Sequence, residues 1–314
     1  MLYAGVDIGG TNVKLGLVDS DGAIVAKSMF KTDPGLDCFA VVDEILKHLK
    51  RLTDSVHTDM RSLGGIGIGI PGVADTERGI VVAAANVGWY NVELARDVER
   101  KSGLRCVIGN DANCAALGEQ RFGGGKAYRN IVFITLGTGV GSGIVIDGKL
   151  FAGMGSAGAE AGHMTLIYEG EMCNCGKRGC WERYASATAL IMQTNDAIDR
   201  NPDSYLAYLA RKQGKVSGRT AFEASEHGDR VAMQVVEQYI RYIAEGLISL
   251  GNILHPQAFV IGGGISHEGD KLMRPLCEYV NAYLDKSGFR PAIDVVRATL
   301  GNGAGTVGAA ALVM

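Results

Sequence analysis

The chain has 314 residues, of which 47% are hydrophobic and 21% are charged, a composition typical of a soluble globular protein with a sizeable core. Its formal net charge of −3 and its pI near 6.1 exclude the basic footprint of a nucleic-acid-binding protein. The 45 glycines are about twice the usual share of roughly 7%, but they cluster beside apolar runs without a period, which excludes a collagen-like or low-complexity chain.

The N-terminus and the apolar runs predict neither export nor a membrane anchor. The first ten residues, MLYAGVDIGG, lack the basic region and long apolar run of a secretory signal. The weakly polar stretch from Ile131 to Ile146 is too short to span a membrane. We therefore expect a cytoplasmic protein that binds neither membrane nor nucleic acid. In that compartment, seven cysteines indicate reduced thiols or metal ligands rather than a disulfide framework.

The first third of the chain reads as an α/β segment. Residues 2–30 predict a strand, a glycine turn, a second strand, an Asp-Gly turn and a third strand. Apolar residues at helical spacing predict a helix over 39–49. Residues 64–72 read as a buried strand ending at Pro71-Gly72, and residues 105–108 as a short strand that leads into Asn110-Asp111-Ala112-Asn113.

Residues 130–153 repeat the strand and turn pattern of the first segment about 125 residues later. The shared glycine-rich first turn favours a duplicated α/β domain, although strand–turn–strand units are common in many folds. The rest of the chain predicts helices over 185–199, 204–212, 220–226, 230–254 and 269–285, strands over 258–261 and 293–297, and a closing small-residue helix over 303–314 suited to close packing on a sheet.

Three glycine turns follow apolar strands, and the first is a candidate phosphate-binding loop. Asp7 ends a strand and is placed to hold Mg²⁺ directly or through water. The backbone N–H groups of Gly9, Gly10 and Thr11 are available to phosphate, and Lys14 adds positive charge. The alternative is an ordinary hairpin turn, and the pattern is not a P-loop because no Gly-Lys-Ser/Thr follows at the right spacing.

The other two turns extend the same interpretation. Gly137-Thr138-Gly139 follows the second copy of the strand pattern, so the two related hairpins are able to grip a chain of phosphates from opposite sides. Gly262-Gly263-Gly264 follows a buried strand and would let a flat adenosine lie against the backbone. Taken alone, the third turn is equally typical of any strand-to-helix connection.

Asp111 is the candidate general base. It comes at the end of a strand, where a carboxylate is able to accept a proton from a substrate hydroxyl during phosphoryl transfer. The alternative is a helix cap, since Asp and Asn are favoured at the start of the helix that follows. Both roles are compatible with each other.

In order and placement these motifs resemble the superfamily of sugar kinases, heat-shock proteins and actin, and within it the ROK family, above all its glucokinases. The resemblance covers essentially the whole chain. Ser142 and Ala159 are small departures at positions where glycine is common. The residues that carry the resemblance are Asp7 to Thr11, Pro71-Gly72, Asn86 to Trp89, Asn110 to Asn113, Leu136 to Gly143, Glu160 to His163, the cysteines of residues 172–182 and Gly262 to Gly264.

The resemblance implies a two-domain, actin-like (ribonuclease H-like) α/β fold, with duplicated β-sheet domains and a cleft between them. The smaller N-terminal domain would comprise residues 1–117 and about 300–314. The larger C-terminal domain, residues 118–299, would carry a zinc loop and the ATP site. Members of the family often form homodimers or higher homo-oligomers, and we expect the same here.

Three cysteines lie within eight positions, at Cys173, Cys175 and Cys180, and His163 lies ten residues before them. Three thiolates and one imidazole complete a closed tetrahedral zinc site. The alternatives are a redox pair, which the spacing does not match, and core cysteines, which the polar neighbours disfavour. In the family this zinc is structural and fixes one ring nitrogen of His163, leaving the other for a sugar hydroxyl.

The resemblance assigns sugar contacts to Gly72, Asn86, Asn110, Asp111, Glu160, His163 and Glu182. It implies ATP-dependent phosphorylation of the 6-hydroxyl of glucose, with Asp111 as base and Mg²⁺ on the phosphates. A kinase for N-acetylglucosamine, mannose or allose remains an alternative, because the same core residues serve several sugars. A repressor is disfavoured because the first strand begins at Leu2 without a preceding DNA-binding module, and a non-catalytic sugar sensor because Asp111 and the glycine turns are intact.

Overall fold

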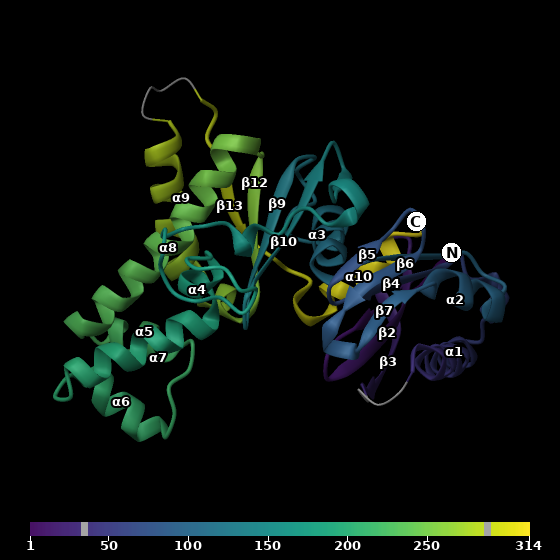
Figure 1. Cartoon of the computed structure of the whole chain (residues 1–314), viewed down its shortest axis with the longest axis horizontal. Helices are drawn as coiled ribbons and strands as arrows, with labels where there is room; N and C mark the ends of the chain where they lie inside the picture. The colour runs from purple at the N-terminus through teal and green to yellow at the C-terminus, as the bar shows by residue number, and fades with distance from the viewer. Residues whose placement is uncertain (33–36, 286–289) are drawn as a thin grey trace. The chain divides into compact units, whose positions relative to one another are not determined.

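Figure 1 shows a computed structural model of the chain, in which residues 1–32, 37–285 and 290–314 are described. The chain forms two compact units. The first comprises Met1–Phe133, Gly143–Ala159 and Thr299–Met314, and the second comprises Ile134–Ser142 and Glu160–Ala298. The predicted domain boundary between residues 117 and 118 falls inside helix α3 (Asp111–Phe122). The first unit is longer than the first predicted domain because it also includes residues 118–133 and Gly143–Ala159.

The first unit is built on a five-stranded sheet in the order β3-β2-β1-β4-β8. The hairpin strands β1, β2 and β3 are antiparallel, whereas β1, β4 and β8 run parallel. The strands are β1 (Leu2–Ile8), β2 (Asn12–Asp19), β3 (Ile24–Lys31), β4 (Ile66–Ile70) and β8 (Cys106–Asn110). Every residue of β4 is buried, as expected for a central parallel strand covered on both faces.

Helix α1 (Cys38–Ser55) contributes one apolar face to the core of this unit. Its side chains at Val41, Val42, Ile45 and Leu49 are spaced at three and four residues and are buried. Asp37 caps the helix, because its side chain accepts the backbone N–H of Ala40. The sequence predicts the existence of this helix and places its start within one residue, but the predicted end at Leu49 lies six residues before the observed end at Ser55.

Helix α10 (Ala304–Ala311) packs closely against the sheet and against α3, as its small residues predict. A Cβ built on Gly67 of β4 would lie only 1.7 Å from the carbonyl oxygen of Ala309, so the strand and the helix backbone meet without an intervening side chain. In Figure 1 this yellow helix lies beside the strands of the first sheet.

A small three-stranded sheet and helix α2 were not predicted. The sheet has the order β5-β6-β7, with β5 (Val73–Asp75), β6 (Ile80–Ala84) and β7 (Trp89–Val92). These strands are short and expose large side chains such as Val82 and Tyr90, which hides the alternation that marks a strand. Helix α2 (Leu94–Ser102) buries only Leu94, Ala95 and Val98 among its apolar residues, too few for a periodic signal.

The second sheet has the order β11-β10-β9-β12-β13. Its strands are β9 (Ile131–Leu136), β10 (Val140–Ile146), β11 (Lys149–Phe151), β12 (Ala258–Gly262) and β13 (Asp294–Arg297). In each sheet, three strands that are consecutive in the chain lie side by side, with the first of them innermost. Two later strands then extend the sheet beyond that first strand, in chain order. This matched topology agrees with the predicted duplication.

The second unit carries a layer of helices, and each helix predicted between residues 185 and 285 matches an element of the structure within two residues at each end. The helices are α4 (Glu182–Ala185), α5 (Ala187–Arg200), α6 (Tyr205–Gln213), α7 (Thr220–Glu226), α8 (Arg230–Leu254) and α9 (Asp270–Leu284). Within the described parts of the chain, no helix has the length and apolarity needed to cross a membrane.

Candidate active site

In the first unit, the predicted polar residues gather where the parallel strands end. Asp7 of β1 pairs with Gly69 of β4, and Ile70 of β4 pairs with Asn110 of β8. The carboxyl ends of these three strands therefore lie along one edge of the sheet, which is where α/β proteins bind their ligands. This register explains how residues far apart in the sequence come to share one site.

Asn110 caps helix α3, so the capping role that was the alternative for Asp111 belongs to its neighbour. The Asn110 Oδ1 atom accepts the N–H of Asn113 at 3.1 Å, and its Nδ2 donates to the Gly72 carbonyl at 3.0 Å. Asp111 is the first residue of α3, with a half-buried side chain that accepts the N–H of Ala112 at 2.8 Å. The structure thus brings Gly72, Asn110 and Asp111 together.

Asp7 is a largely buried carboxylate with one cationic neighbour. Lys14 Nζ lies 3.7 Å from its Oδ2 atom. Burial raises the pKa of the Asp7 carboxyl above its usual range, and Lys14 opposes that shift only in part. A Cβ on Gly305, in the first turn of α10, would lie 2.7 Å from the Asp7 Cγ atom. Gly305 is thus a site residue that the sequence did not reveal.

The first glycine turn joins β1 to β2 beside Asn86. The N–H of Gly9 donates to the carbonyl of Asn12 at 2.9 Å, which closes the turn. Gly10 and Thr11 are exposed at its tip. A Cβ on Gly10 would lie 3.8 Å from the Cβ of Asn86, so the predicted phosphate turn and this predicted sugar contact are neighbours.

In the second unit, the other two glycine turns lie close together. Gly137 donates its N–H to the Gly139 carbonyl at 3.0 Å, and Thr138 is exposed between them. A Cβ on Gly263 would lie 2.3 Å from the carbonyl oxygen of Leu136, the residue before that turn. The segment Gly262-Gly263-Gly264 therefore passes directly against the strand end that leads into Gly137-Thr138-Gly139.

Glu182 connects the second glycine turn to the cysteine cluster. A Cβ on Gly139 would lie 2.4 Å from the Glu182 Oε2 atom, while Oε1 accepts the thiol of Cys173 at 2.9 Å. Glu160 is exposed, and its carbonyl accepts the N–H of His163 at 3.0 Å in a short 3-10 turn. Glu160, His163 and Glu182 thus lie on adjoining segments of this unit.

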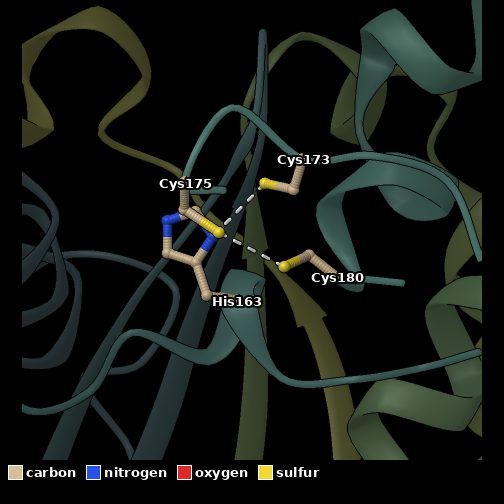
Figure 2. Close-up of side chains that lie close together, drawn as sticks. All are labelled: His163, Cys173, Cys175 and Cys180. Atoms are coloured by element: carbon tan, nitrogen blue, oxygen red, sulfur yellow. Dashed lines mark hydrogen bonds between the residues drawn. The ribbon is translucent and has the colours of Figure 1, made fainter. Parts of the chain in front are cut away.

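The cysteine cluster has the spacing of a metal site. Figure 2 shows the His163 ring and the three cysteine side chains pointing toward one another. Their candidate ligand atoms all lie within 4.8 Å of one another, with 3.6 Å between the sulfurs of Cys175 and Cys180 and 3.7 Å between Cys173 Sγ and His163 Nδ1. Tetrahedral zinc, with bonds of about 2.3 Å to sulfur and about 2.0 Å to nitrogen, separates its ligands by roughly 3.5–3.8 Å.

The basic residues of this loop donate hydrogen bonds to backbone carbonyls, and the positive charge of Lys177 partly opposes the burial that raises the pKa of Cys180. Lys177 Nζ donates to the His163 carbonyl at 3.0 Å, and an Arg178 guanidinium nitrogen donates to the Gly170 carbonyl at 3.2 Å. The pKa of Cys175 is lowered mainly by the backbone N–H of Lys177, whereas burial raises the pKa of Cys173 to about 12. The two side chains therefore also hold the shape of the loop.

Ser142 is a second residue whose function the sequence did not reveal. Its buried hydroxyl accepts the N–H of Ala161 at 2.9 Å, which ties the short turn that carries His163 to strand β10. The signal was present in the sequence as a serine where the family usually has glycine.

Comparison with known proteins gives full-length matches. The model of the ROK family matches residues 3–314. A glucokinase of Streptomyces coelicolor is 38% identical over 99% of this chain and 97% of its own length, and one of Thermotoga maritima is 36% identical over 98% and 96%. The crystal structure of a ROK family glucokinase from Streptomyces griseus, in complex with glucose and AMPPNP, superposes with a TM-score of 0.81 at 36% identity and covers 99% of both chains. This likeness confirms the predicted sugar-kinase fold.

Proposed function

The chain belongs to the ROK family, and we propose that it transfers the γ-phosphoryl group of ATP to the 6-hydroxyl of glucose. The observation that carries the proposal is the full-length similarity to glucokinases, one of them solved with glucose and an ATP analogue. The reactive side chains expected of such an enzyme are present and grouped within each unit.

Sugar recognition rests on two groups of side chains. Gly72, Asn86, Asn110 and Asp111 come from the first unit, and Glu160, His163 and Glu182 come from the second. Carboxylates accept hydrogen bonds from sugar hydroxyls, and amides both donate and accept, so each group suits sugar hydroxyls. A sugar that lacks one hydroxyl leaves a polar group unpaired, which gives such a site its selectivity.

Asp111 acts as the general base in this proposal. A sugar hydroxyl is a poor nucleophile at neutral pH, and its proton needs an acceptor as the bond to phosphorus forms. Because Asn110 already caps α3, the carboxylate of Asp111 is not needed to start the helix. Since Asn110 provides the cap, a chemical role for Asp111 is favoured.

The nucleotide interacts with the three glycine turns. Backbone N–H groups of Gly9, Gly10 and Thr11 and of Gly137, Thr138 and Gly139 bind phosphate oxygens, with Lys14 adding positive charge. Gly262, Gly263 and Gly264 lie against the adenosine. Asp7 is the side chain that would hold Mg²⁺, which neutralises charge on the phosphates when it is bound.

His163, Cys173, Cys175 and Cys180 would hold a structural zinc ion. The separations of 3.6 and 3.7 Å between ligand atoms and the donor set fit a tetrahedral site. Nδ1 is the ring atom of His163 on the sulfur side, which leaves Nε2 for a sugar hydroxyl. A thiolate has no proton to donate, so a metal-bound Cys173 would also release Glu182 Oε1 for the sugar.

We further propose that the protein acts in the cytoplasm as a homodimer or higher homo-oligomer. Family membership supports this statement, and light scattering of the purified protein tests it by comparing the measured mass with multiples of the 33.1-kDa chain.

A coupled assay of ADP release across glucose, mannose, allose and N-acetylglucosamine tests the proposed reaction. We expect glucose to give the highest kcat/KM. A much higher value for another hexose would overturn the choice of glucose while keeping the kinase, and no sugar-dependent ADP release from any of them would overturn the kinase itself.

A further inference from the structure

Glu119 is a buried carboxylate to which no role has been assigned so far. Its side chain has no solvent exposure. Oε2 accepts the N–H groups of Gly124 at 2.8 Å and of Thr299 at 3.0 Å, and Oε1 accepts the N–H of Leu300 at 2.8 Å. Among residues 1–32, 37–285 and 290–314, no Lys, Arg or His nitrogen forms an ion pair with it.

These three bonds join two segments that are 175 residues or more apart in the chain. Gly124 lies in the turn that follows α3, two residues after the helix ends at Phe122. Thr299 is the residue at which the chain returns from the second unit to the first. Glu119 therefore binds the first two residues of the returning segment, Thr299 and Leu300, to α3.

The returning segment leads directly into α10, which packs against α3 with almost no side chain between them. A Cβ on Gly118, the residue before Glu119, would lie 2.9 Å from the backbone nitrogen of Gly308. At the other end of α10, an Arg121 guanidinium nitrogen donates to the Ala311 carbonyl at 2.6 Å. Two side chains near the end of α3, Glu119 and Arg121, thus hold α10 at both of its ends, and the two helices also meet closely at Gly118.

Each of these two helices begins beside an acidic residue of the proposed site. Asp111 is the first residue of α3, and the first turn of α10 lies against the carboxyl of Asp7 through Gly305. A shift of α10 relative to α3 would change the position of Asp7 with respect to Asp111. Errors of about 1 Å in such a constellation cost ~10²-fold in rate.

We infer that Glu119 is a positioning residue for phosphoryl transfer: it holds α10 in register with α3 and thereby sets Asp7 relative to Asp111. The inference rests on the proposed kinase function. Glu119 touches neither substrate nor nucleotide in this account and acts only through the two helices.

The experiment compares Glu119→Gln with a matched control, Asp229→Asn. Asp229 is also a carboxylate that accepts backbone N–H groups from two segments, Leu206 at 3.1 Å and Ala232 at 2.8 Å, but it lies among the helices of the second unit. Glutamine has one carbonyl oxygen, so at least one of the three bonds to Glu119 is lost.

Both variants should lower Tm, because both leave a backbone N–H without its acceptor. At a temperature well below either Tm, we expect Glu119→Gln to lower kcat by roughly 10- to 100-fold, raise the Mg²⁺ concentration needed for half-maximal activity, and change KM for glucose less than about threefold. Asp229→Asn should keep the wild-type kcat. Hydrogen exchange should speed up at the amides of Thr299 and Leu300 in Glu119→Gln alone.

A wild-type kcat in folded Glu119→Gln, or an equal loss of kcat in Asp229→Asn, would overturn the positioning role and leave a purely structural one. If Glu119→Gln does not fold, Glu119→Asp gives the same test, because it keeps the charge but is one methylene too short to reach both segments. Wild-type activity in the same assay reports separately on the proposed function, so the two failures are distinguishable.

Discussion

Asp111 and Asn110 are adjacent, but they have different roles in the structure. Asn110 caps α3 and binds the Gly72 carbonyl, whereas Asp111 follows it at the first helical position. The sequence alone left the cap and the base as joint alternatives for Asp111. They were indistinguishable there because Asn and Asp cap about equally well, and only the geometry shows which side chain does so.

Asp111→Asn should lower kcat by ~10²–10⁴-fold, the usual range for loss of a positioned general base. Glucose affinity should change far less, because an amide still forms a hydrogen bond with the hydroxyl. Steady-state assay and calorimetry on the same variant measure the two quantities. The control is Asp37→Asn, the same exchange at the cap of α1, which should change neither. A near-wild-type kcat for Asp111→Asn would remove Asp111 from the chemistry.

Asp7→Asn should stabilise the protein at neutral pH while impairing catalysis. Burial raises the pKa of Asp7 in the folded state above its value of 3.8 in the unfolded chain, so the native state binds more protons just above that pH. Stability from this group is therefore full below 3.8 and is lost as pH rises through the folded pKa. Asparagine avoids that loss.

Thermal melts across pH check this expectation. The Tm of Asp7→Asn should exceed that of the wild type at pH 7, and the gap should close as pH is lowered toward 4. A variant less stable than the wild type at pH 7 would show that Lys14 outweighs the cost of burial.

At the scale of elements, the cysteine loop links metal binding to sugar binding. It places His163 and Glu182 beside the same sulfur, since Cys173 Sγ lies 3.7 Å from His163 Nδ1 and 2.9 Å from Glu182 Oε1. Ligand type and count in the sequence were sufficient to predict this cluster. The hydrogen bonds of Lys177 and Arg178 to carbonyls were not predictable, because charge alone does not say which acceptor a long side chain reaches.

Cys175→Ser should lose the metal and weaken glucose binding together, because His163 and Glu182 lose their common support. Metal analysis should find about one zinc per wild-type chain and far less in the variant. Cys277→Ser, a change outside the cluster, should keep both metal and affinity. Full glucose affinity in metal-free Cys175→Ser would disprove the coupling.

Packing of α10 gives a second prediction for an element. Gly67→Ala places a methyl group where the Ala309 carbonyl oxygen lies, and backbone on both sides leaves no flexible side chain to move. We expect Tm to fall by roughly 6 °C or more, as for a loss of about 3 kcal/mol. Val25→Ala, an exposed site on β3 of the same sheet, is the control and should change Tm by only a few degrees. An equal Tm for Gly67→Ala and wild type would show that α10 shifts to make room for the methyl group without loss of stability.

At the scale of the whole molecule, the sequence predicted the long, periodic elements and the repeated sheet. It did not predict the β5-β6-β7 sheet or α2, whose short, charged or exposed segments carry little periodicity. Nor did it show that Glu119 binds Thr299 and Leu300, because contacts across so many residues leave no local pattern. What could be predicted was local and periodic, and what could not was either too short to show a period or held by long-range contacts.

The place of α10 has a consequence for the order in which the protein is made. Residues 299–314 complete the core of the first unit, yet the ribosome synthesises them only after the entire second unit. The first unit therefore lacks α10 until the second unit has been synthesised. Its folding cannot be completed first, in contrast to the usual N-terminal-first order. We expect a nascent chain stalled with only residues 1–298 outside the exit tunnel to be cleaved readily by protease in its first 133 residues, and protection should appear once α10 has emerged. Equal protection before and after that point would show that the sheet closes without its last helix.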